Sequence, residues 1–458
     1  MIKLNFTKVI NGNYFSATAP DKLEYHANSL LCINQQGYLE AIIWQNDPEY
    51  HRTLIDAEKR HILWRLDTNQ YILPGFIDLH IHAPQWPNAG AALDLPLSEW
   101  LDTYTFPLEA KFKDAQFAQE VYSNLVTTLI ANGTTTAVYF GSVDNIGNLT
   151  LARECQQIHQ RGFIGKVIMD NPEQTPTYYR DESPAAAISA TEQFIEALTQ
   201  LNQDQSIQMT PVITPRFLPS CTPETLRGLG ELVQHYHLPV QSHCSESDWE
   251  DGYALTTYGH RDAEVLDHFG LLTDKSIMAH GTLLTQSDLA LFKKRGVAIA
   301  HCPISNNYFG NAILPAQKIL AQGNKIGMGT DISGGFSPSI YQNIQQAVMA
   351  GRVLHHGVNG QLSPEQRGTA TPALTARNAF YMATVGGAQS LQLKTGQIKP
   401  GYLADLQIVH SAYPTFLDES SDTIFEKLMY QTSAHEIDAV LTQGIIAKGP
   451  QTTTSDQS

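Results

Sequence analysis

The sequence predicts a (β/α)8 barrel of the TIM type, with a small flanking β-sandwich domain built from both chain ends. Eight apolar runs rich in β-forming residues follow one another through the middle of the chain, and helical patterns separate them. Strands that alternate with helices pair in parallel, and eight such units close into a barrel. The predicted parts are 1–70 and 396–450 for the sandwich, 71–395 for the barrel and 451–458 for a disordered tail.

Each of the eight runs carries a polar side chain at or near its end, and in four of them that residue is histidine. In chain order they are ILPGFIDLHIH, TTTAVYF, GKVIMD, MTPVITPRF, LPVQSHCSE, SIMAHGT, VAIAHCP and KIGMGTD. The interval FAQEVYSNLVTTLIANG shows apolar residues at helical spacing and stops at Asn-Gly. TIM barrels carry their active sites at the C-terminal ends of the strands. The expected site therefore contains the terminal residues His80 and His82, Tyr139, Asp170, Arg216, His243, His280, His301 and Asp331.

The two chain ends differ from the middle of the chain in the length and spacing of their apolar runs. Short apolar runs such as LLCI and AIIW alternate with turn-rich pieces in the first 70 residues, which predicts small strands. The stretches TGQIKPGYLADLQIVH and IDAVLTQGIIAKG predict strand-turn-strand units near the other end. The polar ending PQTTTSDQS predicts disorder.

Composition and charge exclude several classes of function. The chain of 458 residues carries 29 basic and 45 acidic residues, a net charge of −16, with no basic run longer than three residues. Nucleic-acid backbones are bound by clustered Lys and Arg, so we expect no nucleic-acid partner. No stretch approaches the roughly 18 apolar residues of a membrane span, and the N-terminus lacks an apolar core of signal-peptide length. We expect a soluble protein with no membrane partner.

The cysteines indicate a reducing compartment. Five are scattered without paired spacing, at positions 32, 155, 221, 244 and 302. A sparse, odd set is typical of free thiols in a cytoplasmic protein rather than of a disulfide framework. The chain also lacks any C-x-x-C, which excludes the small zinc deaminases that carry H-x-E and P-C-x-x-C.

His80-Ile81-His82 is the first candidate metal motif. Residues i and i+2 of a strand point to the same face, so both imidazoles aim into the barrel mouth. Imidazole is the commonest protein ligand for zinc-like metals. Spacing alone makes this a weak signal, and its place at the end of an apolar strand strengthens it.

Further candidate groups end later runs. Glu246 follows His243 by three residues and fits a general base beside a metal, or a solvated loop carboxylate. Asp331 fits a metal ligand or the N-cap of a following helix. Three histidines and an aspartate leave an open position for water, whose pKa a bound metal lowers toward neutrality. His280 could orient the resulting hydroxide or be structural, and His301 is a candidate pocket wall.

The motifs PGFIDLHIHAPQ, SHCSE, MAHG, AHCP and GTD together resemble the amidohydrolase superfamily, in its mononuclear cytosine-deaminase-like branch. The longer stretch HIHAPQWPNAGAALDLPLSEWLDTYTFPLEAKF, with NGTTTAVYF, GKVIMD and VITPRF, resembles the guanine deaminases. The resemblance runs from about residue 70 to about residue 410. Binuclear relatives of this architecture use a barrel lysine as a bridge. Lys166 lies at the start of its predicted run, the wrong end for that role, so we expect one metal.

The resemblance implies a hydrolytic deamination of guanine to xanthine and ammonia. It implies one Zn²⁺ per chain held by His80, His82, His243 and Asp331, although the same ligand set also suits Fe²⁺. Catalysis would rest on Glu246, Asp331 and His280. Substrate contacts would come from His82, Gln85, Arg216, Phe217, His243, Glu246 and Asp331. A homodimer is also implied.

Two other interpretations stay open from the sequence alone. One is deamination of another aminated heterocycle, such as 8-oxoguanine or a pyrimidine, because pocket walls decide which ring fits. The other is an inactive scaffold, which the presence of every expected ligand argues against. Arg216 could instead form an ion pair at the barrel rim, and Phe217 could pack in the core.

Overall fold

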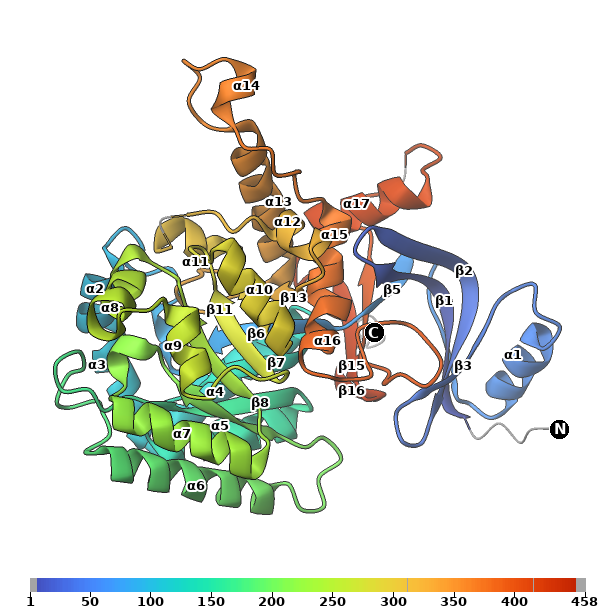
Figure 1. Cartoon of the computed structure of the whole chain (residues 1–458). Coiled ribbons are helices and arrows are strands. Elements are labelled where there is room, and N and C mark those ends of the chain that lie inside the picture. Colours follow the sequence, from blue (N-terminus) through green and yellow to red (C-terminus); the bar gives the residue numbers. More distant parts are fainter. Residues whose placement is uncertain (1–5, 311, 415, 450–458) are drawn as a thin grey trace.

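The computed structural model describes residues 6–310, 312–414 and 416–449, and shows a barrel beside a mixed sheet (Figure 1). The predicted tail 451–458 lies outside the described residues. Eight parallel strands pair in chain order and confirm the predicted barrel. They are β6 (Phe76–His82), β7 (Thr134–Phe140), β8 (Arg161–Ile168), β9 (Thr210–Pro215), β10 (Val240–Cys244), β11 (Ser276–His280), β12 (Ala298–His301) and β13 (Lys325–Met328).

The barrel is nearly closed by backbone contacts between its first strand and the segment after its last. The Asp331 N–H donates to the His80 carbonyl at 2.8 Å, and the His82 N–H donates to the Ile332 carbonyl at 2.7 Å. The Thr330 hydroxyl donates to the buried Asp78 carboxylate at 2.5 Å. These bonds bring β6 against the residues that follow β13.

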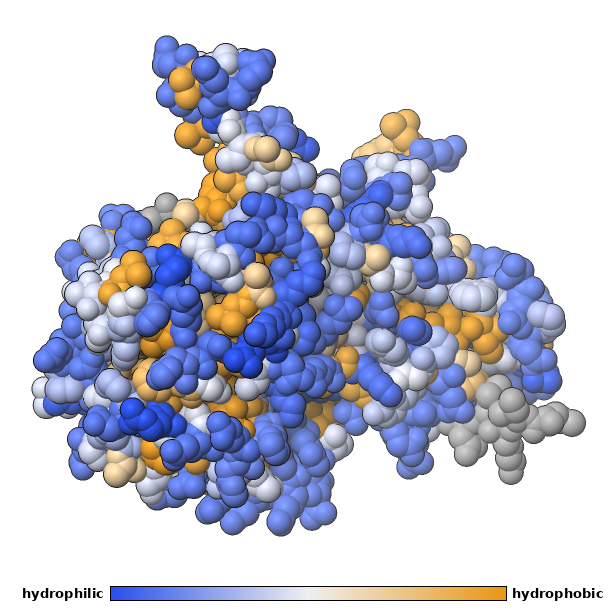
Figure 2. All heavy atoms as spheres, in the orientation of Figure 1, coloured by the Kyte–Doolittle hydropathy of each residue, from blue (hydrophilic) through white to orange (hydrophobic). Residues whose placement is uncertain are grey.

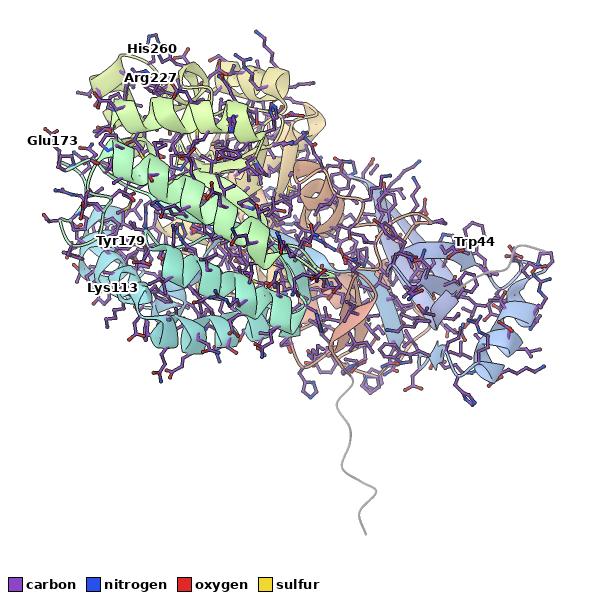
Figure 3. The ribbon with its side chains drawn as sticks, turned by 90° about the horizontal axis from the view of Figure 1, so that it is seen from below. Trp44, Lys113, Glu173, Tyr179, Arg227 and His260 are labelled. Atoms are coloured by element: carbon purple, nitrogen blue, oxygen red, sulfur yellow. The ribbon has the colours of Figure 1, made fainter. Side chains whose placement is uncertain are left out.

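Amphipathic helices cover the outside of the barrel. The main ones are α4 (Ala115–Ala131), α5 (Asn145–Ile158), α6 (Pro184–Leu201), α7 (Pro223–Tyr236), α10 (Gln286–Arg295) and α13 (Ile340–His356). Several lie side by side in the view from below (Figure 3). The Asp114 carboxylate caps α4 by accepting from two backbone N–H groups, and Gly133, at φ 86°, follows the helix. The predicted Asn-Gly stop is thus where the helix ends.

Shorter helices connect or cover these elements. Those that follow β6 are a 3-10 turn (Ala83–Asn88), α2 (Leu97–Trp100), a π-helical turn (Leu101–Thr105), α3 (Phe106–Glu109) and a second 3-10 turn (Ala110–Lys113). A 3-10 turn (Leu218–Ser220) follows β9. The others are α8 (Asp248–Tyr258), α9 (Asp262–His268), α11 (Pro303–Tyr308), α12 (Ala316–Ala321), α14 (Pro364–Arg367), α15 (Ala376–Tyr381), the π-helical turn Met382–Gly386, α16 (Gly387–Ser390) and α17 (Ser421–Gln431).

Both chain ends contribute to one mixed sheet, as predicted for the flanking domain. Its path is β16-β15-β14-β5-β1-β2-β3, with β4 paired to β1. One core cluster draws on both ends, including Ile10, Leu31 and Ile72 from the first and Ile408 and Leu441 from the second. The strands are β1 (Phe6–Ala19), β2 (Lys22–Asn34), β3 (Leu39–Ile43), β4 (Leu63–Arg65), β5 (Gln70–Pro74), β14 (Leu406–His410), β15 (Ile437–Thr442) and β16 (Ile445–Lys448).

Two details of this sheet differ from the expectation. The boundary predicted between residues 70 and 71 falls inside β5, which pairs with β1 and β14. A helix, α1 (Tyr50–Lys59), lies in a segment expected to hold only strands, because Tyr50, Thr53 and Ala57 bury one helical face. Figure 3 shows Trp44 on this side of the molecule, with Tyr179 and His260 on the barrel.

The long helix α13 and the short α14 form a projection away from the barrel (Figure 1). Figure 2 shows apolar surface along this projection. The exposed apolar side chains there are Met349, Val353, Val358 and Leu362. Among the described residues, no helix has both the length and the apolar character needed for crossing a membrane.

Candidate active site

Four histidines and one aspartate converge at the C-terminal ends of the strands. His80 and His82 end β6 two residues apart, His243 lies on β10, and His280 ends β11. The Nε2 of His80 lies 3.0 Å from the Asp331 carboxylate, and the Nε2 atoms of His82 and His243 lie 3.0 Å apart. All five side chains are buried. The i, i+2 spacing therefore does place both imidazoles of the first motif in the barrel mouth.

Asp331 occupies an irregular segment rather than a strand end. β13 ends at Met328, three residues earlier than the sequence pattern indicated. The alternative N-cap role is wrong, since the next helix begins at Ile340 and is capped by Ser339. Asp331 and His280 adopt φ angles of 50° and 70°, in the left-handed region. Backbone of this kind is strained for non-glycine residues and clusters at functional sites.

The donor atoms of this cluster fit a divalent cation. Nε2 of His80 and Nε2 of His280 are buried and make no hydrogen bond. Burial lowers the pKa of His80, His82, His243 and His280, which keeps the imidazoles neutral with free lone pairs. Buried nitrogen and carboxylate atoms facing one another without shared protons are the environment that a metal ion satisfies.

Neighbouring groups set the orientation of two of these rings. Nδ1 of His243 lies 2.5 Å from the Arg216 carbonyl oxygen, and Nδ1 of His280 lies 2.9 Å from the Asn306 side-chain oxygen. An oxygen acceptor at Nδ1 holds the proton there and leaves Nε2 free to bind a metal or accept a proton.

Glu246 lies beside the cluster in the loop after β10. Its Oε1 is 3.6 Å from Nε2 of His280, and its backbone N–H donates to the Glu250 carboxylate at 2.7 Å. Burial, and then the nearby Asp331 charge, raise the pKa of Glu246 to about 8, which Arg216 partly opposes. A carboxyl group with a pKa near neutrality is suited to both accepting and donating a proton.

A pocket opens above the cluster, with about 490 Å³ of space that includes open solvent. The predicted residues His82, His243, His280, Glu246 and Asp331 line it, together with Gln85, Arg216 and Phe217. Leu97, Trp100, Leu101, Trp249 and Phe309 complete an apolar wall. Flat apolar walls with a few polar groups suit an aromatic heterocycle.

Arg216 both lines this pocket and forms a buried ion pair. Its Nη1 and Nη2 donate to the Glu109 carboxylate at 2.7 and 3.1 Å. The ion-pair alternative therefore holds, but the pair is buried rather than at the rim. Phe217 also lines the pocket, with its ring 5.4 Å from that of Trp249.

Lys166 has a different position from the one the sequence suggested. β8 begins five residues earlier, at Arg161, so Lys166 lies toward the C-terminal end of the strand and not at its start. Its buried Nζ donates to Asp181 at 2.7 Å and to the Val167 carbonyl at 3.2 Å. The ion pair with Asp181 occupies the amino group, so a bridging role still has no support.

Three other strand-end residues lie outside the pocket. His301 lines a separate small cavity with Leu314 and Leu354 instead of serving as a wall of the main pocket. The Asp170 carboxylate accepts from the backbone and hydroxyl of Thr222 at the start of α7. The Tyr139 hydroxyl donates to Gln160. Asp170 and Tyr139 therefore form structural hydrogen bonds.

Glu109, Asn306 and Trp249 are among the pocket or cluster neighbours that the sequence analysis did not single out. Glu109 lies within the stretch LPLSEWLDTYTFPLEAKF, whose resemblance to the guanine deaminases was visible, but its ion-pair partner is 107 positions away. Asn306 follows the AHCP motif closely. Its polar side chain, close behind this motif, was the only feature of the sequence that pointed to Asn306.

Comparison with known proteins shows the family of this chain. Residues 71–446 match the sequence profile of the amidohydrolase family. The chain belongs to the amidohydrolase family. It is 34% identical to the guanine deaminase of Dictyostelium discoideum, covering 97% of this chain and 99% of the relative. It is 36% identical to that of Homo sapiens, covering 83% of each.

A solved structure supports the same grouping. The guanine deaminase of C. acetobutylicum, with guanine bound in its active site, superposes on this amidohydrolase with a TM-score of 0.85. The two sequences are 29% identical, and the match covers 96% of this chain and 99% of the other.

Proposed function

We propose that this amidohydrolase converts guanine and water to xanthine and ammonia. One observation carries the proposal. Arg216 and Gln85 line the pocket that opens above the cluster of His80, His82, His243 and Asp331. The 34% and 36% identity to guanine deaminases over most of the chain supports it.

We further propose that His80, His82, His243 and Asp331 hold one divalent cation, zinc in preference to iron(II). Three imidazole nitrogens and a carboxylate are ordinary zinc ligands, and such a set leaves a position open for substrate or water. When bound, the cation supplies activation of water for attack on a carbon that bears an amino group. Elemental analysis of the purified protein distinguishes zinc from iron.

The polar groups above the cluster have separate roles in this proposal. Glu246 accepts the proton of the attacking water and delivers it to a ring nitrogen of the base, which makes the neighbouring carbon more electrophilic. Asp331 accepts a second proton on its way to the departing ammonia. His280, with its Nδ1 proton held by Asn306, lies 3.6 Å from Glu246 and orients the water.

The remaining contacts recognise the purine. Arg216 donates to the carbonyl oxygen of guanine, and the Gln85 amide pairs with its polar edge. The Phe217 ring packs on the flat base. His82 and His243 complete the contacts beside the reacting carbon, since both line the pocket.

The direct test is ammonia release by the purified protein from guanine, 8-oxoguanine, cytosine and adenine. We expect turnover of guanine to exceed that of the other three. A clear preference for 8-oxoguanine or cytosine would favour the second candidate, deamination of another aminated heterocycle. No release from any base, with metal bound, would favour a scaffold and refute the proposal.

Two further properties are proposed on the same basis. A second copy of this chain would cover the apolar projection of α13 and α14, where Met349 and Val358 are 60% and 80% exposed, to give a homodimer. Light scattering of the purified protein tests this. A cytoplasmic location is supported by five cysteines that are all buried and unpaired.

A further inference from the structure

Glu109 is a buried carboxylate that contacts two residues of the pocket at once. It ends the short helix α3 and is 1% exposed. Its Oε2 accepts from Nη1 of Arg216 at 2.7 Å, while its Oε1 accepts from Nη2 at 3.1 Å and from Nε2 of Gln85 at 2.8 Å. One carboxylate therefore holds both side chains to which we assign recognition of the base.

The pairing fixes the plane of the Arg216 guanidinium. Two parallel N–H···O bonds to a carboxylate orient a guanidinium more strictly than one bond does. The ring of Phe106, on the same helix, has its centroid 5.0 Å from Cζ of Arg216. Burial would lower the pKa of Arg216, but the Glu109 charge and hydrogen bonds outweigh it and raise the pKa. The remaining N–H groups can then serve the pocket that Arg216 lines.

Gln85 is oriented in the same way. Its Nε2 donates to Glu109, and its Oε1 accepts from the Ser333 N–H at 3.3 Å. A carboxylate on one side and an N–H on the other allow only one of the two amide orientations. The donor and acceptor that Gln85 presents are thus set by Glu109 and Ser333 together.

We propose that Glu109 is the positioning residue that selects neutral purines carrying a ring carbonyl, by aligning Arg216 and Gln85 and balancing the charge of Arg216. The inference rests on the proposed function. Without Glu109, a buried guanidinium would lack a counter-charge and would not be held in the plane that meets a carbonyl oxygen. Glu109 reaches the substrate only through its two neighbours, so it affects binding of the carbonyl more than the chemical step.

Glu109→Gln is the decisive variant. Both carboxylate oxygens accept from N–H donors, so an amide NH2 in either orientation faces a donor. We expect KM for guanine to rise about tenfold or more, the effect of losing a charged hydrogen bond, with a smaller change in kcat. The inhibition constant of 2-aminopurine, which keeps the amino group and lacks the carbonyl, should change by less than about threefold, because that bond is absent from its complex.

A matched control separates this role from a general loss of packing. Asp405→Asn breaks another buried ion pair, in which Arg161, the first residue of β8, donates to Asp405 at 2.6 Å. It should lower thermal stability and leave the ratio of guanine KM to 2-aminopurine inhibition constant unchanged. Should Glu109→Gln not fold, Arg216→Lys keeps the buried charge but not the paired bonds, and should raise the same ratio.

The outcomes are distinguishable. A rise in KM for guanine without a matching rise in the inhibition constant of 2-aminopurine supports the inference. Equal weakening of both ligands, or an unchanged ratio in Glu109→Gln and Arg216→Lys, overturns it and makes Glu109 purely structural. A wild-type protein that releases no ammonia from guanine overturns the proposed function first, and the inference with it.

Discussion

The main-chain carbonyl of Arg216 lies 2.5 Å from Nδ1 of His243. The residue that we assign to the base thus also orients, through its backbone, a residue that we assign to the metal. Because β9 and β10 are neighbours in the barrel, the end of one strand supports the side chain of the next. Substitutions of the Arg216 side chain leave this carbonyl in place, which separates recognition of substrate from metal binding.

We expect the purified protein to carry about one divalent metal per chain, because the candidate ligands described in the barrel mouth, four histidines and Asp331, form two triads that share His80 and so make one site. Elemental analysis alongside activity measures this. His80→Ala should lose both the metal and the activity. Two metals per fully active chain would refute the mononuclear site.

Lys166→Met should leave metal content and ammonia release at their normal levels, since the Lys166 amino group pairs with Asp181. Removing one partner of a buried ion pair costs about 3–5 kcal/mol, so the free energy of unfolding should fall by about that amount. Denaturant unfolding and elemental analysis together check this. Loss of metal with unchanged stability would instead show that Lys166 is a ligand.

Arg216→Ala should lower kcat/KM for guanine by about ten- to a hundredfold or more, the effect of losing a charged hydrogen bond. It should also reduce stability by about 3–5 kcal/mol, because Glu109 is left as an unpaired buried charge. Metal content should stay normal, since the carbonyl that contacts His243 remains. Activity at the wild-type level would remove Arg216 from the binding site.

Glu246→Gln should lower kcat by at least about a thousandfold, because an amide of the same shape cannot accept a proton and general acid-base steps are worth about 10²–10⁴ each. Metal content and KM should change little. Glu154→Gln, at a buried glutamate on α5, is the matched control and should keep full turnover. A Glu246→Gln protein without metal would mean that Glu246 is a ligand instead.

The native protein should resist thiol reagents at neutral pH, because all five cysteines are buried. Burial raises the pKa of each thiol, that of Cys32 to about 12. A chromogenic thiol reagent should detect almost no thiol in the folded protein and about five per chain in denaturant. Rapid reaction of a thiol in the folded state would contradict the buried arrangement.

Features that depend on neighbours along the chain could be predicted from the sequence. The order of barrel strands, the stop of α4 and the i, i+2 pair His80 and His82 follow from side-chain alternation and helical spacing. The strand limits were predicted less well: the third run began at Gly165, four residues after β8 begins at Arg161, and the eighth run extended past the end of β13 to Asp331. An apolar run shows that a strand exists more clearly than where it stops.

The sequence by itself determined the barrel, its histidine-rich end and the family resemblance, because each depends on residues that are close together along the chain. Only the tertiary structure decided which charges meet. Glu109 pairs with Arg216 across 107 positions, and Lys166 pairs with Asp181 in a loop beyond its own strand. A buried charge must find a partner to offset its lost hydration, and the partner is whichever group the packed strands and loops bring within reach.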